Sequence, residues 1–180
     1  MKGMVFTNFL EMVEEKFSMD VVDTIIEESK VPSGGVYTTV GTYPHSEMVA
    51  LLQALEKEVS IPIPDLLKVY GKHLFGKLAT GYPALISDCS NSRDLLLKLD
   101  GVIHVEVKKL YPDAELPRFA STELPDGRLQ MHYLSDRHME DLAEGLLHGC
   151  FEHFNESVTM DRVPLEDGTV KFIIQYESAQ

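Results

Sequence analysis

His104 lies in a stretch of apolar residues, Val102, Ile103, Val105 and Val107. A neutral imidazole is a good axial ligand for iron, and an apolar shell would keep water from competing for the metal. The alternative is a core histidine hydrogen-bonded to the backbone, which is the commoner situation for a single histidine among apolar residues. The residue by itself leaves metal ligation and core packing both open.

A second group of polar side chains comes at Tyr133, Ser135 and Arg137. Alternate residues of a strand share one face, so a strand over 128–137 would point both hydroxyls and the guanidinium the same way. Arginine matches a carboxylate through two parallel hydrogen bonds, and the hydroxyls can donate further ones. The trio therefore predicts a carboxylate clamp; a half-exposed strand that ends in a surface ion pair is the alternative.

The composition restricts the partners and the compartment. The 180-residue chain has 16 lysines and arginines against 29 aspartates and glutamates, a formal charge of −13. Such an acidic surface repels phosphate backbones and anionic lipid, so we expect neither nucleic acid nor a membrane as partner. The N-terminus lacks the apolar stretch of a signal peptide, and Cys89 and Cys150 make no disulfide framework. These features favour a cytoplasmic protein with free thiols.

Two kinds of periodicity divide the chain at a loop-like gap over 80–93. Apolar residues at helical spacing predict helices over about 2–17, 19–29, 46–58, 65–79 and 92–110. The turn sequences 125–127 and 166–168 each predict a hairpin, and an amphipathic helix at about 138–154 separates them. Helices followed by strand–strand–helix–strand–strand predict an α+β fold with an antiparallel sheet of about four strands.

The ordered motifs resemble those of the H-NOX family, heme nitric oxide/oxygen binding sensors related to the heme domain of soluble guanylate cyclase. They span the whole length: Met1-Lys2-Gly3-Met4-Val5, Tyr70-Gly71-x-x-Leu74-Phe75, His104 with Leu110-Tyr111-Pro112, Pro117, Tyr133-x-Ser135-x-Arg137 and Gly145-Leu146-Leu147-His148-Gly149. The resemblance implies one domain over 1–180. It would have a distal helical part at about 1–84, a proximal part at about 85–180, and heme b between the two.

The resemblance also implies roles for single residues. His104 would be the axial ligand of the heme iron, and Tyr133, Ser135 and Arg137 would hold the two heme propionates. Pro117 corresponds to the proline that presses on the porphyrin in this family. Apolar side chains would form the distal pocket and its surroundings: Val5, Phe9, Phe75, Leu142 and Leu146.

Leu142 bears on which gas is bound. Oxygen-binding members of the family have a tyrosine five residues after the motif arginine, where this chain has leucine. Bound oxygen carries partial negative charge and benefits from a hydrogen-bond donor, whereas nitric oxide binds ferrous heme tightly without one. We therefore expect a sensor that binds nitric oxide and carbon monoxide and excludes oxygen.

The expected output is a conformational change and not catalysis, because no glycine-rich phosphate loop, HExxH or Gly-x-Ser-x-Gly motif occurs. Nitric oxide weakens the bond between iron and the axial histidine, so the helix that carries His104 would lose its tether and the two parts would shift. Stand-alone bacterial relatives act on a histidine kinase or on a cyclic-di-GMP enzyme (a diguanylate cyclase or phosphodiesterase). The alternative is a heme-free module that binds a carboxylated apolar metabolite or lipid through Arg137.

Overall fold

The computed structural model of the protein describes residues 1–177. Its N-terminal half is helical and consists of α1 (Gly3–Lys16), α2 (Met19–Ser29), α3 (His45–Val59) and α4 (Ile63–Gly81). The inner faces of these helices form one buried cluster around side chains such as Phe6, Phe9 and Leu51. The four helices begin and end within two residues of the predicted ranges, because their amphipathic periodicity is strong.

The C-terminal half carries the sheet. After a short 3₁₀ turn, η1 (Pro83–Leu85), it consists of α5 (Ser92–Lys98), the π-helical turn η2 (Leu99–Ile103), α6 (His104–Leu110), β1 (Arg118–Glu123), β2 (Leu129–Leu134), α7 (Glu140–His153), β3 (Val158–Pro164) and β4 (Val170–Tyr176). All neighbouring strands are antiparallel, in the order β1-β2-β4-β3. The predicted α+β fold with a four-stranded antiparallel sheet is therefore confirmed.

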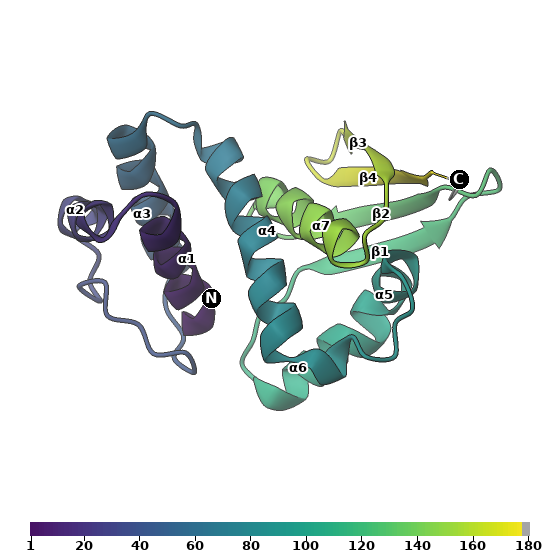
Figure 1. The fold of residues 1–180 in the computed structure, drawn as a ribbon, viewed down its shortest axis with the longest axis horizontal. Coiled ribbons are helices and arrows are strands. Elements are labelled where there is room, and N and C mark those ends of the chain that lie inside the picture. Colours follow the sequence, from purple (N-terminus) through teal and green to yellow (C-terminus); the bar gives the residue numbers. More distant parts are fainter. Residues whose placement is uncertain (178–180) are drawn as a thin grey trace.

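Helices α4 and α7 lie side by side and join the two halves, with the N-terminal helices beyond α4 and the sheet beyond α7 (Figure 1). Glycines permit this close crossing. A Cβ atom at Gly145 would lie 2.2 Å from the carbonyl oxygen of Lys68, and one at Gly71 would lie 2.4 Å from that of Leu142. Because real Cβ atoms do not approach backbone so closely, residues with side chains would force the helices apart.

The helix predicted over 92–110 is interrupted just before His104, because α5 gives way to η2 and α6 begins at that histidine. The carboxylate of Asp100, within η2, accepts a hydrogen bond from the backbone N–H of Phe119 at 2.8 Å. This bond draws the turn toward β1, and Gly101 weakens the local preference for α-helix. Because a π turn contains more residues than an α-helical turn, His104 faces a different direction from the one it would have if α5 continued as an α-helix.

Two further sequence predictions concern thiols and membranes. Neither Cys89 nor Cys150 forms a disulfide, and Cys150 is buried. Within residues 1–177 no helix combines the length and the apolar character needed to span a bilayer.

Candidate functional site

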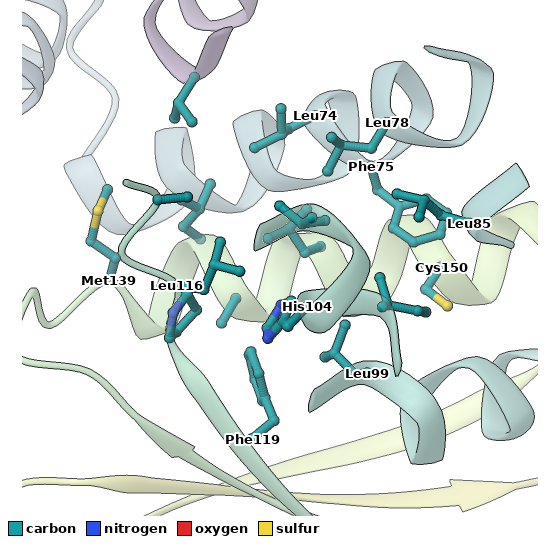
Figure 2. Close-up of a pocket in the computed structure, with 18 of the residues that line it drawn as sticks. Leu74, Phe75, Leu78, Leu85, Leu99, His104, Leu116, Phe119, Met139 and Cys150 are labelled. Carbon is teal, nitrogen blue, oxygen red and sulfur yellow. The ribbon is translucent and has the colours of Figure 1, made fainter. Parts of the chain in front are cut away.

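A cavity of about 310 Å³ lies where α4, α6, α7 and the start of β1 meet. Apolar side chains supply most of its wall, and leucine, isoleucine, valine and phenylalanine make up half of the lining residues. Figure 2 shows Leu74 and Leu78 of α4 across the cavity from His104 and Phe119. A mostly apolar cavity of this size with a few polar groups is typical of a cofactor site.

His104 is the first residue of α6, and its ring contributes to the cavity wall. Its Nδ1 lies 2.9 Å from Oδ1 of Asp100. Because a carboxylate can only accept, Nδ1 carries the proton and donates it to Asp100. Burial lowers the pKa of His104, with the Asp100 charge acting in the opposite direction. No residue within 1–177 hydrogen-bonds Nε2, so its lone pair is available, as in metal-ligating histidines.

Tyr133, Ser135 and Arg137 all line the cavity, as the sequence analysis expects, but a single strand face does not bring them together. Strand β2 ends at Leu134, so Ser135 and Arg137 lie in the turn that follows. The Ser135 hydroxyl accepts a hydrogen bond from the backbone N–H of Arg137 at 3.3 Å, which bends the chain there. The prediction of one strand over 128–137 is wrong at its end, because local side-chain bonding replaces the ladder.

The Arg137 guanidinium already holds a carboxylate at the cavity mouth. Its Nη2 donates to Oε2 of Glu115 at 2.5 Å, and its Nη1 donates to the Glu115 carbonyl oxygen at 3.1 Å. The Glu115 side chain is 83% exposed, so the carboxylate of a ligand could replace it at little cost. Burial raises the pKa of Tyr133, which keeps its hydroxyl protonated and able to donate. This end of the cavity is therefore suited to acidic groups.

The other expected pocket residues divide into two sets. Those that line the cavity are Pro117, Val5, Phe75, Leu142 and Leu146. Phe9 does not line it: the side chain is fully buried in the N-terminal core, where its ring meets the Tyr70 ring edge-on with the centroids 5.3 Å apart. Helical spacing shows that a residue faces inward, but not whether it meets the core or a cavity.

Sequence analysis missed two contacts at the cavity. Asp100 had a signal, because the i, i+4 spacing from His104 places two helical side chains on one face. The second contact joins the hydroxyls of Tyr82 and Tyr111, which line the cavity and lie 2.6 Å apart. No sequence pattern indicated this contact, because the two residues belong to different elements.

A family model described as haem-NO-binding matches residues 2–162. The chain belongs to this haem-NO-binding, or H-NOX, family. The Fe(II) unliganded H-NOX protein of K. algicida is 44% identical, with a TM-score of 0.92 over 99% of this chain and 98% of that chain. The S. oneidensis H-NOX protein in the Fe(II)NO state is 28% identical, with a TM-score of 0.92 over 99% of this chain and 100% of that chain.

A curated relative is much longer than this H-NOX domain. Soluble guanylate cyclase gcy-35 of Caenorhabditis elegans is 24% identical over 140 residues, which is 76% of this chain and 20% of that protein. The chain therefore spans about a fifth of the length of this relative. H-NOX domains are heme-binding, gas-sensing domains.

The residues of this H-NOX domain fit heme. Heme is a flat apolar macrocycle with iron at its centre and two carboxylates at one edge. The cavity has an apolar wall, it is lined by the polar side chains of Tyr133, Ser135 and Arg137, and the His104 ring faces it with an Nε2 that has no hydrogen-bond partner within residues 1–177. Arg137 already holds the Glu115 carboxylate, so its guanidinium is placed to bind an acidic group there.

We expect Asp100→Asn to weaken His104 as a ligand. The amide keeps the shape of the side chain but removes the negative charge that polarises the Nδ1–H of His104, and its single acceptor oxygen can serve only one of the N–H groups of His104 and Phe119. Loss of such a partner lowers the affinity of the site for its metal group by roughly 10- to 100-fold. Transfer of heme from the ferrous variant to an excess of a competing apoprotein measures this. Equal transfer rates for variant and wild type would show that Asp100 only shapes the π turn.

Proposed function

We propose that this H-NOX domain is a nitric oxide sensor. It binds nitric oxide and carbon monoxide at ferrous heme b, excludes oxygen, and signals to a partner by changing shape. One observation carries the proposal: His104, oriented by Asp100 and with a free Nε2, lies in an apolar cavity that ends in a carboxylate clamp. The likeness to the S. oneidensis protein in its Fe(II)NO state supports it.

Each group of residues has a task in this proposal. Heme supplies a ferrous iron that binds a diatomic gas. His104 would hold the iron through Nε2, and Tyr133, Ser135 and Arg137 would bind the two propionates. Pro117 would press on the macrocycle. The distal wall is apolar and consists of Val5, Phe75, Leu142 and Leu146, with Phe9 packed behind it.

The apolar wall is the basis for the choice of gas. Helices α4 and α7 turn Leu74, Leu78, Leu142 and Leu146 toward the cavity, and none of these side chains has a hydrogen-bond donor. Bound oxygen needs such a donor because negative charge develops on it, whereas nitric oxide and carbon monoxide do not. The wall therefore admits the latter two and retains oxygen poorly.

His104 connects gas binding to the fold. There are two buried clusters: one is formed mainly by the N-terminal helices, with Met139 and Leu142 added from the C-terminal half, and the other lies between α5, α7 and the sheet. His104 is on the C-terminal side, in the expected proximal part. Helix α6 has no fully buried residue, and Val107 is the residue on it that packs against the core, so a bond from His104 to the metal would be one of its few anchors. Loss of that bond would free α6 to move and would let the two parts shift. A histidine kinase or a cyclic-di-GMP enzyme in the cytoplasm would read this change.

Optical spectra of the heme-loaded ferrous protein test the proposal. We expect nitric oxide and carbon monoxide each to shift the Soret band. We expect no stable oxygen complex in air, because Leu74, Leu78, Leu142 and Leu146 carry no hydrogen-bond donor and the cavity-lining hydroxyl of Tyr82 is paired with that of Tyr111. A persistent oxygen spectrum would contradict the gas assignment. Protein that stays colourless after heme reconstitution would contradict heme binding and favour the heme-free carboxylate binder.

A further inference from the structure

The chain that directly follows α6 is tied to the N-terminal half by side chains. The hydroxyl of Tyr111 lies 2.6 Å from that of Tyr82, the residue that directly follows α4. Two residues on, the Asp113 carboxylate accepts hydrogen bonds from the Lys2 ammonium at 3.1 Å and from the Thr42 hydroxyl at 2.6 Å. We call the five residues that make these contacts the α6 latch: Lys2, Thr42, Tyr82, Tyr111 and Asp113.

The two sides of the molecule are joined in different ways. At the α4–α7 crossing, backbone meets backbone across Gly71 and Gly145, so the helices cannot slide without steric conflict. Helix α6 has no buried residue, and Val105 and Leu110 on it are 46% and 56% exposed. Of the apolar residues of α6, Val107 is the one that packs against the core, so the position of α6 depends largely on His104 at one end and on the α6 latch at the other.

Lys2 makes the α6 latch stronger than an ordinary surface ion pair. Its side chain is only 11% exposed, and its ammonium also donates to the carbonyl oxygen of Val40 at 2.7 Å and lies 5.5 Å from the centre of the Tyr111 ring. Without Asp113, this shielded cation would keep only uncharged partners, which is unfavourable. The Thr42 hydroxyl and then the Lys2 ammonium lower the pKa of Asp113, so the carboxylate is charged at neutral pH.

The geometry makes α6 a short lever, roughly 10 Å long at 1.5 Å per residue. His104 is its first residue, and Tyr111 follows its last. We infer that the α6 latch sets the resting position of His104 and must open before the domain signals. This inference rests on the proposed function and deepens it: Tyr82, Tyr111 and Asp113 are positioning residues that set how readily His104 leaves the metal.

Variants of the heme-loaded full chain test this. Asp113→Asn removes the charge, and Tyr111→Phe removes one hydroxyl of the pair. In the ferrous protein we expect amide hydrogen exchange over residues 104–110 to accelerate by roughly two- to fivefold in the first variant and three- to tenfold in the second. With nitric oxide, a larger fraction of each variant than of wild type will have His104 detached, as read from absorption spectra.

Matched variants separate the α6 latch from general effects. Glu28→Gln breaks an exposed ion pair outside α6, between α2 and α3, with Lys57 at 2.6 Å, and should change neither readout. Asp113→Glu keeps the charge and should restore most of the wild-type exchange. Unchanged exchange over 104–110 in both Asp113→Asn and Tyr111→Phe would overturn the inference. So would equal acceleration in α4 and α7, because it would mark a general loss of stability.

The same samples distinguish failure of the inference from failure of the proposed function. A wild-type spectrum that does not respond to nitric oxide would contradict the proposed sensor, whatever the exchange rates are. A normal nitric oxide response, together with the same fraction of detached His104 in wild type and variants, would leave the sensor standing and contradict the α6 latch.

Discussion

Leu142→Tyr is expected to make the protein retain oxygen, whereas the wild type is expected to release it readily. Leu142 is 9% exposed and lines the cavity from the start of α7. A phenol hydroxyl placed there can donate to bound oxygen where water is excluded, and a hydrogen bond to a charged group in such a place is strong. We expect oxygen to dissociate roughly 10- to 100-fold more slowly than from wild type. Stopped-flow absorption measures the rate.

Leu142→Phe is the matched control, because it has nearly the same volume as the tyrosine variant but no hydroxyl. It should behave as wild type toward oxygen, and both variants should keep their nitric oxide spectra. If the tyrosine and phenylalanine variants lose oxygen at the same rate, position 142 does not face the bound gas and the distal assignment is wrong.

Gly145→Ala is expected to destabilise the protein strongly. Alanine in place of glycine inside a helix normally stabilises it by about 0.5–1 kcal/mol. At Gly145 the sign reverses, because the new Cβ would lie 2.2 Å from the carbonyl oxygen of Lys68 and the backbone of α4 cannot turn aside. Forcing α4 and α7 apart should lower the free energy of unfolding by about 2–4 kcal/mol. Urea denaturation followed by circular dichroism measures this.

Gly76→Ala provides the control on α4, since a Cβ there would meet nothing within 4 Å. It should stabilise the protein by about 0.5–1 kcal/mol, as helix propensity predicts. If Gly145→Ala and Gly76→Ala raised stability equally, the α4–α7 crossing would be looser than described, and the contrast between a fixed crossing and a movable α6 would be lost.

The elements that local sequence specifies could be predicted. The hairpin turns are clear because Gly127 and Gly168 adopt positive φ angles of 83° and 81°, which glycine tolerates best. The π turn before His104 could not be predicted, since it depends on the hydrogen bond between Asp100 and the Phe119 backbone. That bond joins residues 19 positions apart, and a contact of this kind produces no periodic pattern in the sequence.

The candidate site was predictable where its residues are close in sequence or belong to family motifs. His104 and the trio that ends in Arg137 line the same cavity, as expected, whereas Phe9 packs in the core beside it. The α6 latch was beyond sequence reasoning. Tyr82 and Tyr111 are 29 positions apart, and Lys2 and Asp113 are 111 apart, so only the folded chain brings them together.

The iron–histidine stretching band in the resonance Raman spectrum of the ferrous, heme-loaded protein tests most directly whether His104 ligates iron. We predict a band that shifts when histidine is labelled with ¹⁵N, disappears in His104→Gly, and returns when free imidazole is added to that variant. A band that persists unchanged in His104→Gly would show that another side chain holds the metal and would contradict the account.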